Sequence, residues 1–149
     1  MRKEDIDIML ISETHLTNKY NFNIPSFVFH KTNHPDGKAH GGTGILVRNR
    51  LRHFALNEYS KDYIQATSIS VECKSGKIAI SSVYCPPRFT ITKDKFEEFF
   101  RNICSFISLV YNNYNHNITN FKYCNCYLLL QVAYCYPIAF YYQQHFLQL

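Results

Sequence analysis

The sequence predicts an α/β fold in which short strands are followed by one helix. Residues 8–11 form a continuous apolar run bounded by polar residues, which is typical of a strand buried on both faces. Residues 63–72 and 77–84 are two β-rich runs joined by a short connection that contains glycine, which predicts a hairpin. From Thr92 onward, apolar residues recur three and four positions apart and predict an amphipathic helix.

Composition sets the size of the fold and suggests where it ends. The 149 residues suffice for one ordinary domain at most, and 46% hydrophobic residues supply material for a core. The net charge of +5 fits a polyanionic partner and equally fits many proteins that bind neutral ligands. Every Asp and Glu, and every Lys and Arg except Lys122, lies at or before Arg101. This break predicts a domain at 1–108 and a low-charge, Asn/Tyr/Cys-rich tail at 109–149 outside it.

A carboxylate is expected at the end of the first strand. The strand is expected to end on Glu13, with Thr14 and His15 beside it. A carboxylate at the carboxyl end of a buried strand lies where α/β proteins bind ligands. Its oxygens suit a hard divalent cation such as Mg²⁺. The alternative is a surface glutamate that opens a loop.

Between residues 27 and 47 the sequence predicts two more strands, at 27–30 and 45–47. The loop 31–43 contains Pro-Asp-Gly, a turn signature in which proline fixes one backbone angle and glycine permits the next. Gly-Gly-Thr-Gly at 41–44 leads into the strand at 45–47. These glycines favour a tight strand entry over a phosphate-binding loop, because no strand–loop–helix nucleotide motif surrounds them.

Three arginines, Arg48, Arg50 and Arg52, follow the strand at 45–47. The planar guanidinium fork suits a phosphate group, so Arg48 and Arg50 are candidate phosphate ligands. Three arginines in five residues are equally typical of an ordinary solvated loop. The sequence leaves both interpretations open.

The strand at 77–84 places a tyrosine at its end. Two prolines follow directly after Cys85, and proline cannot donate to a strand ladder, so the strand stops at Tyr84. The period of two puts Tyr84 on one face with Ser82, Ile80 and Ile78. The apolar stripe of the following helix predicts core packing, and it consists of Phe96, Phe99, Phe100, Ile103, Phe106 and Ile107.

Cysteine spacing and hydropathy exclude several classes. The six cysteines show neither a disulfide framework nor zinc-ligand spacing, which indicates reduced, incidental thiols. The charged start and short apolar run do not resemble a signal peptide. The apolar segment 127–142 is interrupted by Gln131 and Pro137 and falls short of a membrane span. A soluble or aggregation-prone chain is expected, and membrane association through 127–142 is a weaker alternative.

Four segments in order resemble one known family. They are Ile-Ser-Glu-Thr-His-Leu at 11–16, His-Gly-Gly-Thr-Gly-Ile-Leu-Val-Arg at 40–48, Ile-Gln-Ala-Thr at 64–67 and Ser-Val-Tyr-Cys-Pro-Pro at 82–87. Together they resemble the endonuclease domain of jockey-type non-long-terminal-repeat retrotransposons, over about residues 5–105. That domain belongs to the endonuclease/exonuclease/phosphatase superfamily. Each segment alone is a weak signal, and the set is specific.

The resemblance implies a fold, a reaction and a partner. The fold is a four-layer α/β sandwich, two sheets face to face with helices outside, of which this chain would hold about half. The reaction is Mg²⁺-dependent phosphodiester hydrolysis that nicks DNA, in an intracellular and specifically nuclear protein without a small-molecule cofactor. Glu13 corresponds to the family's metal ligand, and Tyr84 corresponds to the tyrosine that contacts the region of the scissile phosphate.

The chain also departs from the family. The family's first strand, with its asparagine, would precede Met1. A Gly-Asp-Phe-Asn motif is expected at about 110–125, but no aspartate follows Asp94. The final Ser-Asp-His motif is absent too, and His116 and His145 have no acidic partner in the tail. These differences predict a truncated copy without activity. The alternative is a non-catalytic remnant that binds nucleic acid or metal weakly.

Three structural expectations follow from these departures. Residues beyond about 108 are expected to add nothing to the second sheet, because they lack the family motifs and a clear strand alternation. One sheet face is then expected to stay partly uncovered and apolar. His15 is expected to point away from Glu13, as neighbouring residues on a strand do.

Overall fold

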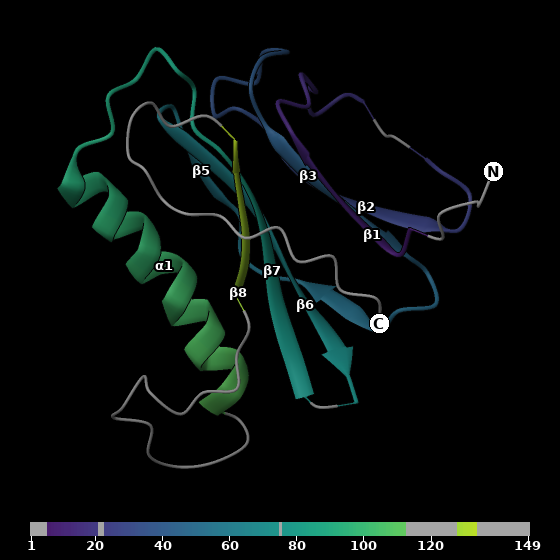
Figure 1. The fold of residues 1–149 in the computed structure, drawn as a ribbon. Coiled ribbons are helices and arrows are strands. Elements are labelled where there is room, and N and C mark those ends of the chain that lie inside the picture. Colours follow the sequence, from purple (N-terminus) through teal and green to yellow (C-terminus); the bar gives the residue numbers. More distant parts are fainter. Residues whose placement is uncertain (1–5, 21–22, 75, 113–127, 134–149) are drawn as a thin grey trace.

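The computed structural model describes residues 6–20, 23–74, 76–112 and 128–133, which form two sheets and one helix (Figure 1). The smaller sheet has three antiparallel strands in the order β1-β3-β2. Its members are β1 (Ile8–Ser12), β2 (Phe27–Thr32) and β3 (Thr43–Arg48). The apolar run of residues 8–11 and the two strands expected near 27–30 and 45–47 are therefore confirmed.

The larger sheet contains the expected hairpin. Its strand order is β4-β6-β7-β8, and the fifth strand, β5, also pairs with β6. All pairs are antiparallel except β7–β8, which is parallel. The strands are β4 (His53–Ala55), β5 (Tyr59–Lys61), β6 (Ile64–Cys73), β7 (Gly76–Tyr84) and β8 (Leu128–Ala133), and the helix is α1 (Lys93–Asn112).

The two sheets pack face to face. Because side chains alternate along a strand, Ile69 and Val71 of β6 and their partners Ile80 and Ile78 of β7 face the same way. They form a core with Ile45 and Val47 of β3. Ser82 and Tyr84 continue this face of β7, as the period of two predicts. Burial of this apolar area, at about 25 cal/mol per Å², stabilises the contact between the sheets.

Helix α1 covers the opposite face of the larger sheet, so the described residues form three layers (Figure 1). Phe99 and Ile103 are 1% and 5% exposed and pack against residues of β5, β6 and β7. The predicted apolar stripe is confirmed up to Ile103. The side chains of Phe106 and Ile107 are outside the part of the chain whose side chains the structure describes. The part described is mostly β-sheet, and the α/β class fits it only loosely.

Strand β1 differs from its prediction. It lies at the edge of the three-stranded sheet, and Met9 on its outer face is 41% exposed. The expectation that residues 8–11 are buried on both faces is therefore wrong. A continuous apolar run does not distinguish a central strand from an edge strand whose outer face carries apolar side chains.

Strand β8 lies in the segment that was expected to add no strand. Leu128–Ala133 pairs in parallel with residues 79–84 of β7. The expectation that nothing beyond residue 108 joins the larger sheet is thus wrong for these six residues. A strand in parallel pairing needs no alternation, because such strands read as apolar runs. The division into a domain at 1–108 and a tail at 109–149 stays a prediction.

Two further expectations concern cysteines and the membrane. Cys73 is half-buried and Cys85 is buried, and the expectation of reduced, incidental cysteines stays a prediction. Within the described ranges no helix has both the length and the apolar character needed to cross a bilayer. Of the apolar segment 127–142, only β8 is described, and the rest lies outside the described residues.

Replacing Tyr59 by phenylalanine is expected to make stability less sensitive to alkaline pH. Burial, and next the hydroxyl of Tyr63, raises the pKa of Tyr59 well above its ordinary value. Folding therefore favours the protonated phenol. The contribution of Tyr59 to stability is fully present below pH ~10, the pKa of the tyrosine in the unfolded chain, and is lost as the pH rises further.

Chemical denaturation at about pH 9 and about pH 11 measures the difference between the two proteins. The wild type is expected to lose more stability over this interval than Tyr59→Phe does. Tyr20→Phe is the control, because Tyr20 is 64% exposed. Equal losses in the wild type and both variants would contradict the assignment.

Candidate functional site

The ends of β1 and β7 meet at one end of the sheet-to-sheet contact. The Ser82 hydroxyl donates to the Ile11 carbonyl at 2.9 Å, which ties the two strands together. Beyond this contact, the Tyr84 hydroxyl donates to Glu13 Oε1 at 2.9 Å. Glu13 and Tyr84, which the resemblance assigns to one site, therefore lie side by side. Their assigned roles, metal ligand and phosphate contact, stay predictions.

The backbone around Glu13 adopts an unusual conformation. Glu13 and His15 have φ values of 59° and 53°, in the left-handed region that non-glycine residues rarely adopt. This conformation costs roughly 1–2 kcal/mol per residue. Two hydrogen bonds hold it, from Thr14 N to the Gly42 carbonyl at 3.2 Å and from His15 N to the Gly41 carbonyl at 2.9 Å.

The glycines before β3 allow this close approach. A Cβ on Gly42 would lie 2.7 Å from Thr14 Oγ1 and 3.1 Å from the Thr32 carbonyl oxygen. A Cβ on Gly41 would lie 2.9 Å from Gln65 Oε1. Both glycines also have positive φ, at 59° and 80°. This geometry supports the interpretation of the Gly-Gly segment as a tight strand entry.

His15 lies near Glu13, and the expectation that it points away is wrong. Its Nε2 is 3.7 Å from Glu13 Oε1. Thr14 separates the two residues in the chain, and neither has strand backbone, so the rule for adjacent strand residues does not apply. Both side chains are about half exposed, at 56% for His15 and 45% for Glu13. Glu13 is therefore accessible to a ligand from solvent.

The Tyr84 side chain is suited to act as a hydrogen-bond donor. Burial, and next the hydrogen bond to Glu13, raises the pKa of Tyr84 to about 12. The phenol therefore stays protonated at neutral pH. It fixes one carboxylate oxygen of Glu13, whose other oxygen remains available on an exposed side chain.

The donor set around Glu13 fits Mg²⁺ only partly. Mg²⁺ prefers six oxygen ligands and is commonly held by one or two carboxylates with several waters. Glu13 supplies one carboxylate, and the neighbouring Thr14 Oγ1 is buried without a hydrogen-bond partner in the described part of the chain. This set would hold the ion weakly, with water completing the coordination.

Arg48 and Arg50 lie at the other end of the three-stranded sheet. The register pairs Ser12 with Thr43, so the end of β1 that leads to Glu13 adjoins the start of β3. Arg48 lies at the opposite end of β3. At about 3.3 Å per residue, the separation along β3 is roughly 16 Å. Arg50 Nη2 lies 2.7 Å from Asp7 Oδ1, and Arg48 Nη2 donates to the Ile6 carbonyl. The structure does not bring these arginines to Glu13, and their phosphate-binding role stays a prediction.

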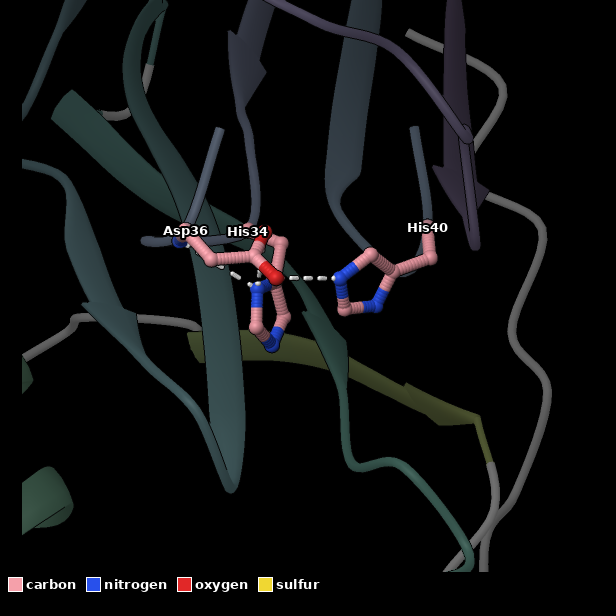
Figure 2. Close-up of side chains that lie close together, drawn as sticks. All are labelled: His34, Asp36 and His40. Carbon is pink, nitrogen blue, oxygen red and sulfur yellow. Dashed lines mark hydrogen bonds and ion pairs between the residues drawn. The ribbon is translucent and has the colours of Figure 1, made fainter. Parts of the chain in front are cut away.

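A second polar cluster, which the sequence analysis missed, lies in the loop between β2 and β3 (Figure 2). His34 Nδ1 is 2.9 Å from Asp36 Oδ1, and His40 Nε2 is 2.7 Å from Asp36 Oδ2. The backbone N–H of Lys38, and next His40, holds the pKa of Asp36 well below its ordinary value. Two histidines near a Pro-Asp-Gly turn are the sequence signal for this cluster, but turn rules describe the backbone and not the side chains.

The two polar groups adjoin each other across Gly41. An ideal Cβ on Gly41 would lie 3.3 Å from Tyr84 Cε1 and 3.6 Å from His34 Cδ2. The rings of Tyr84 and His34 therefore both border the same glycine. His34 is 6% exposed, so it lines the interior of this region, whereas Asp36 lies at the surface.

Comparison with known proteins points to a mobile element. The chain is 37% identical over 99 residues to the probable RNA-directed DNA polymerase from transposon X-element of Drosophila melanogaster. This match covers 66% of the chain and 11% of that protein. No family model matches the chain, and no solved structure does.

Two further relatives are RNA-directed DNA polymerases from mobile element jockey. The chain is 29% identical over 96 residues to that of Drosophila melanogaster and 28% identical over 96 residues to that of Drosophila funebris. Each match covers 64% of the chain and 10% of the relative. The chain thus spans about a tenth of the curated relatives that it matches. These similarities support an origin in a jockey-type retrotransposon.

Proposed function

We propose that this chain carries part of the catalytic site of a Mg²⁺-dependent DNA endonuclease of a jockey-type retrotransposon. The corresponding fold is the four-layer sandwich of the endonuclease/exonuclease/phosphatase superfamily. The observation that carries the proposal is the 2.9 Å hydrogen bond between Tyr84 and Glu13, two residues 71 positions apart. The similarity to the jockey and X-element proteins supports the retrotransposon origin in this proposal.

In this proposal Glu13 binds the metal and Tyr84 contacts the phosphate. The exposed Glu13 carboxylate supplies an anionic oxygen ligand, and the protonated Tyr84 phenol orients it by donating a hydrogen bond. The phenol has a single O–H, so donating to a phosphate oxygen requires this O–H to turn away from Glu13. Bound Mg²⁺ would polarise the phosphodiester and stabilise charge on the leaving oxygen.

Metal binding tests the role of Glu13. Isothermal titration with Mg²⁺ is expected to show weak binding to the wild type and none to Glu13→Gln. Glu72→Gln is the matched control, because the Glu72 side chain is 41% exposed and that of Glu13 is 45% exposed. A micromolar Mg²⁺ affinity that survives Glu13→Gln would overturn the assignment, and so would equal loss in the two variants.

Purified alone with Mg²⁺ or Mn²⁺, this chain is expected not to nick plasmid or abasic DNA above background. Phosphodiester hydrolysis needs a metal, an oriented water and a group that stabilises developing charge, and such groups act as a unit. General acid–base help contributes roughly 10²–10⁴-fold. The sequence holds no Asp or Glu after Glu98 that could pair with a histidine for this purpose.

The nicking assay compares the wild type with Glu13→Ala and Glu72→Ala. Equal background in all three supports the expected lack of activity. Robust cleavage that Glu13→Ala abolishes and Glu72→Ala preserves would show that the residues present suffice for catalysis. That result would contradict the expected inactivity while supporting the metal-ligand role of Glu13.

A further inference from the structure

The polar cluster in the β2–β3 loop has a built geometry that the proposed nuclease chemistry does not use. Gly37 N donates to the His34 carbonyl at 3.0 Å and closes the turn, and Gly37 has a φ of 73° that permits it. Lys38 N donates to Asp36 Oδ1 at 2.9 Å and orients the carboxylate. The turn therefore presents Asp36 between the rings of His34 and His40 (Figure 2).

We propose that His34, Asp36 and His40 bind a transition-metal cation such as Zn²⁺, at a site separate from Glu13. The ligand atoms are His34 Nδ1, an Asp36 carboxylate oxygen and His40 Nε2, and they all lie within 4.8 Å of one another. Two imidazoles and one carboxylate suit Zn²⁺, Co²⁺ or Ni²⁺, whereas Mg²⁺ prefers oxygen ligands alone. Water completes the tetrahedron that Zn²⁺ prefers.

The observed distances allow a metal ion to replace the contacts between Asp36 and the two histidines. With bonds of about 2.0–2.1 Å, the ligand atoms of a tetrahedral zinc site lie roughly 3.3 Å apart. The two nitrogen–oxygen distances to Asp36 are 2.9 and 2.7 Å, so small side-chain movements open the site. The ion then replaces two hydrogen bonds to the same carboxylate. The two imidazole rings are already close, with centroids 4.0 Å apart and planes tilted by 38°.

Burial makes part of this site rigid and leaves part of it open. His34 is 6% exposed and is packed beside Gly41, so its ring has little freedom to leave the site. The side chains of Asp36 and His40 are 38% and 33% exposed, which gives the ion access from solvent. One fixed ligand and two accessible ones favour a site that binds and releases metal reversibly.

The test is a calorimetric titration of the full chain with Zn²⁺ alone. The wild type is expected to bind Zn²⁺, and His40→Ala and Asp36→Asn are each expected to weaken this binding at least about ten-fold, because even outer partners of metal ligands contribute that much. The control is His53→Ala, a histidine on β4 whose Nδ1 contacts the Leu51 carbonyl. These changes leave buried His34 in place, and circular dichroism verifies folding.

Co²⁺ absorption separates this site from binding by the six cysteines. Histidine and carboxylate ligands give ligand-field bands without thiolate charge transfer, and these bands are expected to disappear in His40→Ala and to persist in His53→Ala. No Zn²⁺ binding by the wild type would overturn the proposal. So would binding that both cluster variants retain, since Asp36 would then only fix the loop. The Mg²⁺ titration of Glu13→Gln tests the nuclease proposal independently.

Discussion

Replacing Phe99 by alanine is expected to lower the free energy of unfolding by about 3–5 kcal/mol. Phe99 belongs to helix α1, and its side chain is 1% exposed and packs against the larger sheet. Its ring packs edge-on against Tyr59 with centroids 5.2 Å apart. Truncation removes this contact and leaves a cavity that neighbouring rings fill only partly. A single domain is commonly stable by only ~5–15 kcal/mol, so the loss is a large share of the total.

Urea denaturation followed by circular dichroism measures the change. Phe54→Ala is the matched control, because Phe54 is the same residue type on β4 and is 37% exposed. Its replacement is expected to cost clearly less than that of Phe99. Equal costs at the two positions would mean that α1 does not cover the larger sheet as described.

Replacing Gly42 by alanine is expected to cost about 2–5 kcal/mol, by two additive effects. The φ of 80° places a side chain in the left-handed region, at roughly 1–2 kcal/mol. The new Cβ would also crowd Thr14 Oγ1 at 2.7 Å and the Thr32 carbonyl at 3.1 Å. Overpacking of this kind costs about 1–3 kcal/mol, because a backbone carbonyl cannot simply rotate away.

Gly37→Ala isolates the backbone effect. Gly37 has a φ of 73°, close to that of Gly42, and a Cβ there would meet nothing within 4 Å. Its replacement is therefore expected to cost only the roughly 1–2 kcal/mol of the left-handed conformation. The difference between the two variants measures the crowding beside Thr14. Equal losses would mean that the segment carrying Glu13 does not pack tightly against the start of β3.

Local patterns predicted most of the elements. The β6–β7 hairpin and the start of α1 near Thr92 followed from short-range rules. The family resemblance, not a short-range rule, assigned Glu13 and Tyr84 to one site. The short strands β4 and β5 were not predicted, because three residues carry too little periodicity. These rules act over a few residues, so they succeed for hairpins, helix stripes and strand ends.

Features that depend on distant partners were missed. The sequence did not reveal that β3 lies between β1 and β2, which sends Arg48 away from Glu13. Nor did it reveal β8, whose parallel partner precedes it by 49 residues at Ala79–Leu128. The His34–Asp36–His40 cluster was missed for a different reason. Turn rules describe backbone angles and do not say which side chains the turn brings together.

The 71-residue separation of Glu13 and Tyr84 has a consequence for synthesis of the chain. Ribosomes add about 5–20 residues per second, so Glu13 emerges roughly 4–14 s before Tyr84. The three-stranded sheet is complete in sequence once Arg48 is made, before any residue of β6 or β7 exists. From the synthesis of Arg48 until β6 and β7 are made, the inner face with Ile45 and Val47 has no sheet to cover it. The nascent chain therefore exposes a β-sheet surface to chaperones or to other nascent copies before its site can form.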